Sequence, residues 1–159
     1  ATGVSTFCGQ NLGAGKTDRI KKGILQGVFV GMAYGLVAGI VLIFFGRTLT
    51  LLFVKPSATA VLDASAKYLR CLGFFYWSLG ILNTCRMTTQ GLGYSGRAIL
   101  SGAVEMAARC FVSLALVPIF HFDAICFADQ SAWITATLYI VPTCLLVVRS
   151  IEKKRKEYK

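Results

Sequence analysis

The sequence predicts an all-α protein, a polytopic bundle of helices that crosses a membrane. The first indication is the stretch Gly23–Gly46, whose 24 residues include no charged side chain. At about 1.5 Å per residue, a helix of this length crosses a hydrocarbon core of about 30 Å. The second indication is a composition of 55% hydrophobic and only 15% charged residues, with apolar residues spread along the whole chain. A buried helix of a soluble core is the alternative, but such cores do not need uncharged runs this long.

Within this stretch, five glycines recur at every fourth position: Gly23, Gly27, Gly31, Gly35 and Gly39. Small residues at this spacing let a second backbone approach closely, which matters in lipid because no hydrophobic drive brings helices together there. In a water-soluble helix, each glycine would cost about 1 kcal/mol relative to alanine. We therefore expect this glycine row to be a helix-packing seam.

We expect one partial lobe over residues 1–159, made of the end of a truncated span and four complete spans. The end of the truncated span is placed at residues 1–12, and the complete transmembrane helices at residues 20–45, 68–92, 98–122 and 132–148. A basic tail at residues 149–159 follows the last span.

The connections between the spans have distinct compositions. The amphipathic run at residues 57–68 suits an interfacial helix outside the membrane. The glycine-rich sequence at residues 91–97, GLGYSGR, predicts a tight cytoplasmic turn. Residues 123–131 are expected to form a short outer loop, with Trp133 at the outer end of the last span.

The 17 Lys and Arg residues give a net charge of +10, and their distribution predicts the topology. Most of them flank apolar segments, so membrane orientation explains them better than binding to nucleic acid, and we expect no nucleic-acid partner. Eleven cations fall in the first loop, the 91–97 turn and the 149–159 tail, and four fall on the other side. The positive-inside tendency therefore predicts a multi-pass protein of the cell membrane with a cytoplasmic C-terminus.

Three charged residues, Arg86, Glu105 and Arg109, lie inside expected spans. A charge at the bilayer centre costs at least about 2.5–3.5 kcal/mol, so these side chains need partners or water. Arg86 and Glu105 are nearly equidistant from the expected turn and should bond directly or share a polar cavity, with Asn83 and Gln90 at neighbouring levels. Because two arginines face one glutamate, a further acidic partner is expected outside the sequence given.

This charged group has two interpretations, which the sequence leaves open. It is either a static clamp that holds two helices together or part of a transport pathway in which Glu105 exchanges protons or cations or meets the substrate.

Two other patterns are not assigned a chemistry. Residues 13–17, GAGKT, lack the spacing, the preceding strand and the soluble helix of a phosphate-binding loop, so we interpret them as a helix end followed by a basic loop. The six cysteines contain no CxxC pair and are interpreted as buried thiols without a disulfide framework or metal site. A single His and an intramembrane Glu without metal-ligand spacing make a poor catalytic set, so we do not expect an enzyme.

Three segments resemble one family, the multidrug and toxic compound extrusion (MATE) transporters. Residues 1–23, ATGVSTFCGQNLGAGKTDRIKKG, are similar to a helix end and loop of that family. Residues 86–109, RMTTQGLGYSGRAILSGAVEMAAR, resemble its later hairpin, and residues 128–136, ADQSAWITA, resemble the start of its last span.

The resemblance implies the C-terminal lobe of a twelve-helix transporter, from the end of helix 8 to helix 12. Members of the family pack two similar six-helix lobes around a central cavity and export cationic, amphipathic compounds in exchange for Na⁺ or H⁺. It implies a coupling ion but no other cofactor, and as partners the lipid bilayer, a missing N-terminal lobe and small organic cations. Without that lobe, the fragment should be inactive.

The hypothesis is therefore a secondary antiporter for drug-like compounds, and this lobe's polar contribution to its pathway is Glu105, Arg86, Arg109, Asn83 and Gln90. One alternative is a flippase for lipid-linked precursors, which surplus cations in the cavity would favour because its substrates carry phosphates. The other is a four-span scaffold without transport activity that binds partners through its glycine seams.

Overall fold

The computed structural model describes residues 2–157, which are almost entirely helical and contain no strand. In chain order, the helices are α1 (Thr2–Gly13), α2 (Thr17–Thr50), α3 (Thr59–Gly91), α4 (Ser95–Phe111), the π-helical segment η1 (Val112–Leu116), α5 (Val117–Phe120) and α6 (Phe122–Glu157). The prediction of an all-α bundle is confirmed.

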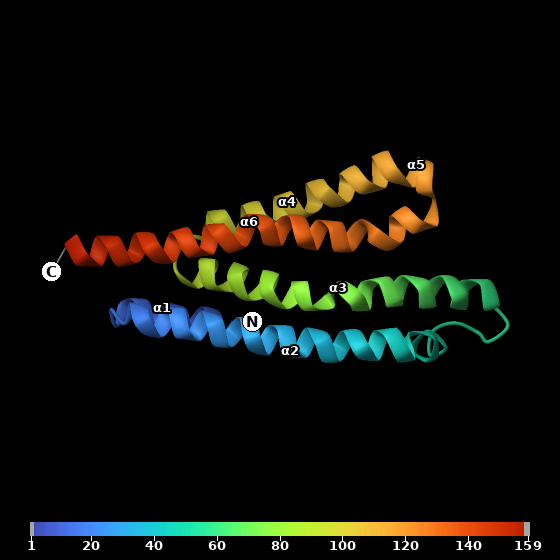
Figure 1. Cartoon of the computed structure of the whole chain (residues 1–159), viewed down its shortest axis with the longest axis horizontal. Helices are drawn as coiled ribbons and strands as arrows, with labels where there is room; N and C mark the ends of the chain where they lie inside the picture. Colours follow the sequence, from blue (N-terminus) through green and yellow to red (C-terminus); the bar gives the residue numbers. More distant parts are fainter. Residues whose placement is uncertain (1, 158–159) are drawn as a thin grey trace.

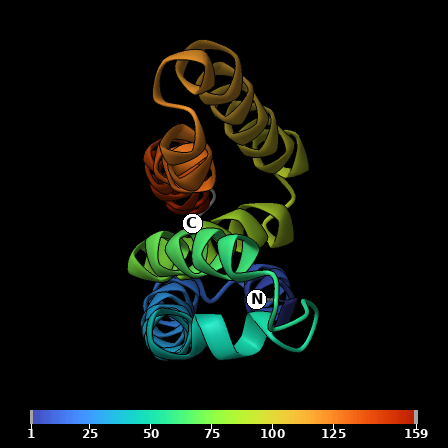
Figure 2. The ribbon, with the colours of Figure 1, turned by 90° about the vertical axis from the view of Figure 1, so that its right-hand side faces the viewer.

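Helix α3 lies at the centre of the bundle (Figures 1 and 2). On one side it packs against α1 and α2, and on the other side against α4 and α6. One buried cluster joins Leu82 and Cys85 of α3 to Ile140 and Cys144 of α6, and a second joins α1 and the start of α2 to the C-terminal part of α6. Helix α3 therefore connects the two pairs of helices.

Three helices are long and apolar enough to cross a membrane: Thr17–Thr50, Ser95–Phe120 and Phe122–Lys156. They contain three of the four predicted spans, at residues 20–45, 98–122 and 132–148. The second of these is predicted two residues too long, because its helix ends at Phe120. Helix α3 is 33 residues long but contains no continuous segment as apolar as those of the three spans. It packs between the other helices, and the span at residues 68–92 stays a prediction.

The glycine row of α2 is a close packing seam against α3, as predicted. A Cβ atom added at Gly31 would lie 3.0 Å from the carbonyl oxygen of Gly80, and one added at Gly35 would lie 2.8 Å from another carbonyl of α3. Gly39 meets Gly73, so both helices contribute glycines to the contact. Side chains at these positions would separate the two backbones.

The N-terminal part of the same row contacts α1 as well. An added Cβ at Gly23 would meet the ring of Phe7, and one at Gly27 would lie 2.8 Å from the Val4 side chain. At this level, the Thr84 hydroxyl of α3 also lies 3.2 Å from the carbonyl oxygen of Gly27. The glycine face of α2 thus packs against both α1 and α3.

Two predicted connections are wrong. The amphipathic run at residues 57–68 is not a separate interfacial helix. Helix α3 begins at Thr59, three residues after Pro56, and continues unbroken to Gly91. Residues 123–131 are not a loop either, because α6 begins at Phe122. The chain turns instead at His121, whose φ of 49° ends α5.

The C-terminal tail is also more regular than its sequence predicts. Helix α6 continues to Glu157, so most of the predicted tail at residues 149–159 is helical. Residues 158 and 159 of that tail lie outside the described range.

Trp133 is a core residue of the bundle. Its side chain is buried between α3 and α6 and meets Tyr76 edge-to-face, with ring centroids 5.9 Å apart. Because α6 begins eleven residues before Trp133, this residue lies well inside the helix. Its predicted place at the outer end of the last span stays a prediction.

Replacing Gly31 with leucine should destabilise the protein, because the new side chain would be forced against the Gly80 backbone. We expect a loss of about 1–3 kcal/mol or more in the free energy of unfolding, measured as a lower thermal midpoint in detergent. The matched control is Gly102→Leu, since a Cβ at Gly102 meets nothing within 4 Å. Equal stability of the two variants would contradict the seam.

Candidate functional site

The charged residues predicted inside the spans meet between α3 and α4. Arg86 of α3 donates a hydrogen bond from Nη2 to Glu105 Oε2 at 2.6 Å and another from Nε to Ser101 Oγ at 2.8 Å. Arg109, one turn after Glu105, reaches the other carboxylate oxygen at 3.4 Å. The predicted contact between Arg86 and Glu105 is confirmed, and Glu105 is shared by two guanidinium groups.

A second carboxylate completes this cluster, and the sequence argument missed it. Asp129 of α6 places Oδ1 3.0 Å from Arg109 Nε and accepts a hydrogen bond from the Tyr68 hydroxyl of α3. The further acidic partner is therefore within the chain and not, as expected, outside it. Asp129 was overlooked because residues 123–131 were assigned to a loop, although Asp129 lies only four residues before Trp133.

We call Arg86, Glu105, Arg109 and Asp129 the charged cluster. The charges of its two guanidinium groups and two carboxylates sum to zero. The four side chains are 18–40% exposed, and Glu105 is the least accessible of them. Paired charges are the form in which ionisable groups persist inside helical membrane proteins. A carboxylate held in this way can still bind a proton or a small cation if one arginine moves away.

The two remaining predicted site residues do not join the cluster. Asn83 instead lines a groove of about 500 Å³ between α1, α2 and α3, together with Tyr34 and Tyr76. Gln90 is exposed near the C-terminal end of α3. Among the described side chains, neither hydrogen-bonds to the charged cluster. Asn83 and Gln90 lie near Arg86 along α3, but different helices surround α3 at each level, so nearness along one helix does not place them in the cluster.

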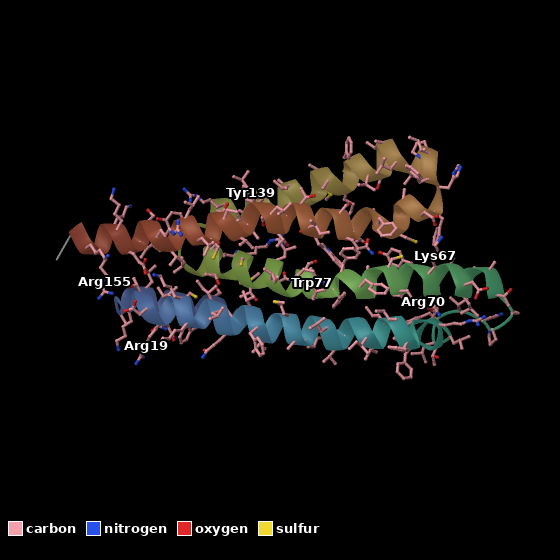
Figure 3. The ribbon with its side chains drawn as sticks, in the orientation of Figure 1. Arg19, Lys67, Arg70, Trp77, Tyr139 and Arg155 are labelled. Atoms are coloured by element: carbon pink, nitrogen blue, oxygen red, sulfur yellow. The ribbon has the colours of Figure 1, made fainter. Side chains whose placement is uncertain are left out.

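Further ion pairs hold the end of the bundle near the α2–α3 connection. Lys67 of α3 pairs with Asp123 of α6, and this hydrogen bond raises the pKa of the exposed Lys67 ammonium group. Arg47 of α2 pairs with Asp63 of α3 at 3.2 Å, and both side chains are largely exposed. Figure 3 shows Lys67 and Arg70 at this end of the molecule. Exposed pairs of this kind contribute little to stability.

The cysteines divide into buried and accessible thiols. Cys8, Cys85, Cys126 and Cys144 are buried, Cys71 is partly buried, and all six are free. The prediction of buried thiols is wrong for Cys110, which is exposed on α4. Within residues 2–157, no group of three His, Cys, Asp or Glu side chains could hold a metal ion.

The apolar helices around a charged interior define the chain as part of a multi-pass helical membrane protein. The family model MatE matches residues 1–114, from α1 into η1, and the chain belongs to this family of transporters. The match includes Arg86, Glu105 and Arg109 and ends before Asp129. No curated protein and no solved structure matches the chain.

Replacing Asp129 with asparagine should destabilise the protein, because Arg109 would lose an ion-pair partner in a half-buried position. We expect a loss of about 1–3 kcal/mol. The control, Asp63→Asn, removes the exposed pair with Arg47 and should cost less than about 1 kcal/mol. Thermal unfolding in the same detergent compares the two, and a larger effect at Asp63 would contradict the structural role of Asp129.

Proposed function

We propose that this chain forms one lobe of a secondary antiporter that exports cationic or amphipathic drug-like compounds in exchange for Na⁺ or H⁺. In this proposal, the protein lies in the cell membrane with its basic C-terminal end on the cytoplasmic side. A second lobe, together with the bilayer, completes the transport pathway. Membership of the MatE family supports transport, and the charged cluster supports ion coupling.

The single observation that carries the proposal is that Glu105 is shared between Arg86 and Arg109. A carboxylate between two guanidinium groups has alternative partners, so it can release one of them when a proton or Na⁺ arrives. Three helices meet at this point, because Asp129 of α6 holds Arg109 from the other side. Exchange of partners would therefore change how α3, α4 and α6 pack.

Such a change is what an alternating-access transporter needs. Secondary transporters expose one site to each side of the membrane in turn by moving helical units against each other. Here the glycine seam would keep α2 and α3 together as one unit, while the charged cluster would control the contact of α3 with α4 and α6.

The charge balance of the cluster argues against the flippase alternative. A flippase for lipid-linked precursors would be favoured by surplus cations facing the cavity. Asp129 removes that surplus, because two arginines face two carboxylates.

The scaffold alternative needs no polar pathway and is tested by aqueous thiol reagents. Cys110, which is exposed on α4 one residue after Arg109, is the useful reporter. Cys85 is not, because it is only 5% exposed and packs in the core. Rapid reaction of Cys110 with a membrane-impermeant reagent in native membranes would contradict a scaffold that has no water-filled pathway.

Replacing Glu105 with glutamine in the native product should lower ion-driven ethidium export at least about tenfold, because the amide cannot exchange a proton or hold Na⁺ in the same way. Export is measured in inside-out membrane vesicles under imposed Na⁺ and H⁺ gradients. The matched control is Glu152→Gln, which also breaks a 2.6 Å pair, with Lys21 at the end of the bundle. Full transport with unchanged ion dependence in the Glu105 variant would reduce the charged cluster to a static clamp.

The need for a second lobe is tested by the intact mass of the product in its native membrane. We expect a species about two to three times heavier than the 17.2 kDa of this chain, since the implied transporter has twelve helices. A 17.2 kDa species without a tightly associated partner would contradict the proposed two-lobe architecture.

A further inference from the structure

Two basic segments that are far apart in the sequence meet at one end of the bundle. They are the start of α2, residues 16–22, and the end of α6, residues 149–157, which together contain nine Lys and Arg residues and three Asp and Glu residues. A 2.6 Å ion pair between Lys21 and Glu152 joins them. Figure 3 shows Arg19 and Arg155 at this end, opposite Lys67 and Arg70.

A pocket of about 410 Å³ lies between the two segments. Two cationic side chains, Lys154 and Arg155, line one part of it, and no carboxylate lines it. The remaining lining is the Thr17 hydroxyl, the backbone at Gly15 and the apolar side chains of Leu12 and Ile151. A neighbouring polar groove contains Asp18 and Glu152, so this pocket is the part of the basic end that is free of acidic side chains.

Arg155 is held in place over the turn that precedes α2. Its Nη1 atom lies 3.5 Å from Thr17 Oγ1, and a Cβ atom added at Gly15 would lie 3.1 Å from its Nη2 atom. Gly15 has a φ of +66°, which favours glycine at this position. Among the described side chains, Arg155 forms no ion pair, so its charge is available to a ligand.

The first turn of α2 presents unpaired amide groups to the same end of the bundle, and its one acidic residue, Asp18, lies in the neighbouring groove and does not line the pocket. Helix α2 is 34 residues long, and its N-cap residue, Lys16, makes no side-chain capping hydrogen bond. The first amide groups of a helix and its dipole favour a negative charge at this position. The anion that fits must reach two cationic side chains and a hydroxyl while its neighbouring groups touch Leu12 and Ile151.

We propose that this pocket binds the phosphate of an anionic phospholipid from the membrane leaflet at the basic end of the bundle. Lys154 and Arg155 contact the phosphate, and Leu12 and Ile151 contact the adjoining glycerol and acyl groups. Basic segments next to a membrane are attracted to anionic lipid by about 1 kcal/mol per cation. The lipid would add to the contacts that already join the end of α6 to α1 and α2, namely the buried cluster around Val147 and the pair of Lys21 with Glu152.

Thermal unfolding of the native product in a neutral maltoside detergent tests this site. Dioleoylphosphatidylglycerol, dioleoylphosphatidylcholine and inorganic phosphate are titrated separately, and each apparent Kd is taken from the rise in the thermal midpoint. We expect the anionic lipid to raise the midpoint at concentrations at which the other two have no effect.

The decisive comparison uses two double variants that remove the same charge from the same helix. Lys154→Gln with Arg155→Gln changes the pocket, whereas Arg149→Gln with Lys153→Gln changes exposed residues outside it. We expect the first to weaken binding of the anionic lipid about tenfold or more and the second to weaken it less than about threefold. Glutamine is a good helix former, so circular dichroism should show the same helix content in both.

Three results would overturn the proposal. Equal weakening by the two double variants would mean diffuse attraction to a basic surface. Equal stabilisation by phosphatidylcholine would mean that the anionic headgroup is not recognised. Equal stabilisation by inorganic phosphate would mean a site for a free anion instead of a lipid.

Discussion

The close contact between the backbones of α2 and α3 is the interaction on which the rest of this structure depends. Lipid does not drive two helices together, so they associate in a membrane through close packing and interhelical hydrogen bonds. Glycines on both sides provide that packing, as at Gly31 against Gly80 and Gly39 against Gly73. This contact holds α3 at the centre of the bundle, although α3 lacks an apolar segment as long as those of α2 and α6.

The position of α3 accounts for the charged cluster. One side of the helix is taken up by glycine packing, so Arg86 must find its partners on the other side, where α4 and α6 lie. Glu105 and Asp129 come from these two helices and are linked through Arg109. The bundle therefore combines a close, nearly apolar contact on one side of α3 with an ionic contact on the other, and in the proposed function the ionic contact is the one that responds to protons or cations.

The two ends of the bundle use their charges differently. At the end near the α2–α3 connection, exposed pairs such as Lys67 with Asp123 join neighbouring helices. At the other end the excess of cations is larger, with nine cations and three acids in residues 16–22 and 149–157, and the pair of Lys21 with Glu152 leaves Arg155 and Lys154 beside a pocket. This asymmetry has the form that the positive-inside tendency predicts for a protein crossing a membrane in one orientation.

The sequence by itself determined the all-α class, three of the apolar helices, the glycine seam and the contact of Arg86 with Glu105, because each depends on spacing along one helix or across one tight turn. Tertiary structure alone decided the role of Asp129, the burial of Trp133 and the separation of Asn83 and Gln90 from the charged cluster. These depend on which helices are neighbours and at what register, and the spacing of residues along a single helix carries no information about its neighbours. The start of α6 at Phe122 likewise depends on the turn at His121. His121 adopts a positive φ, which is uncommon for a residue other than glycine and is not predicted by the local sequence.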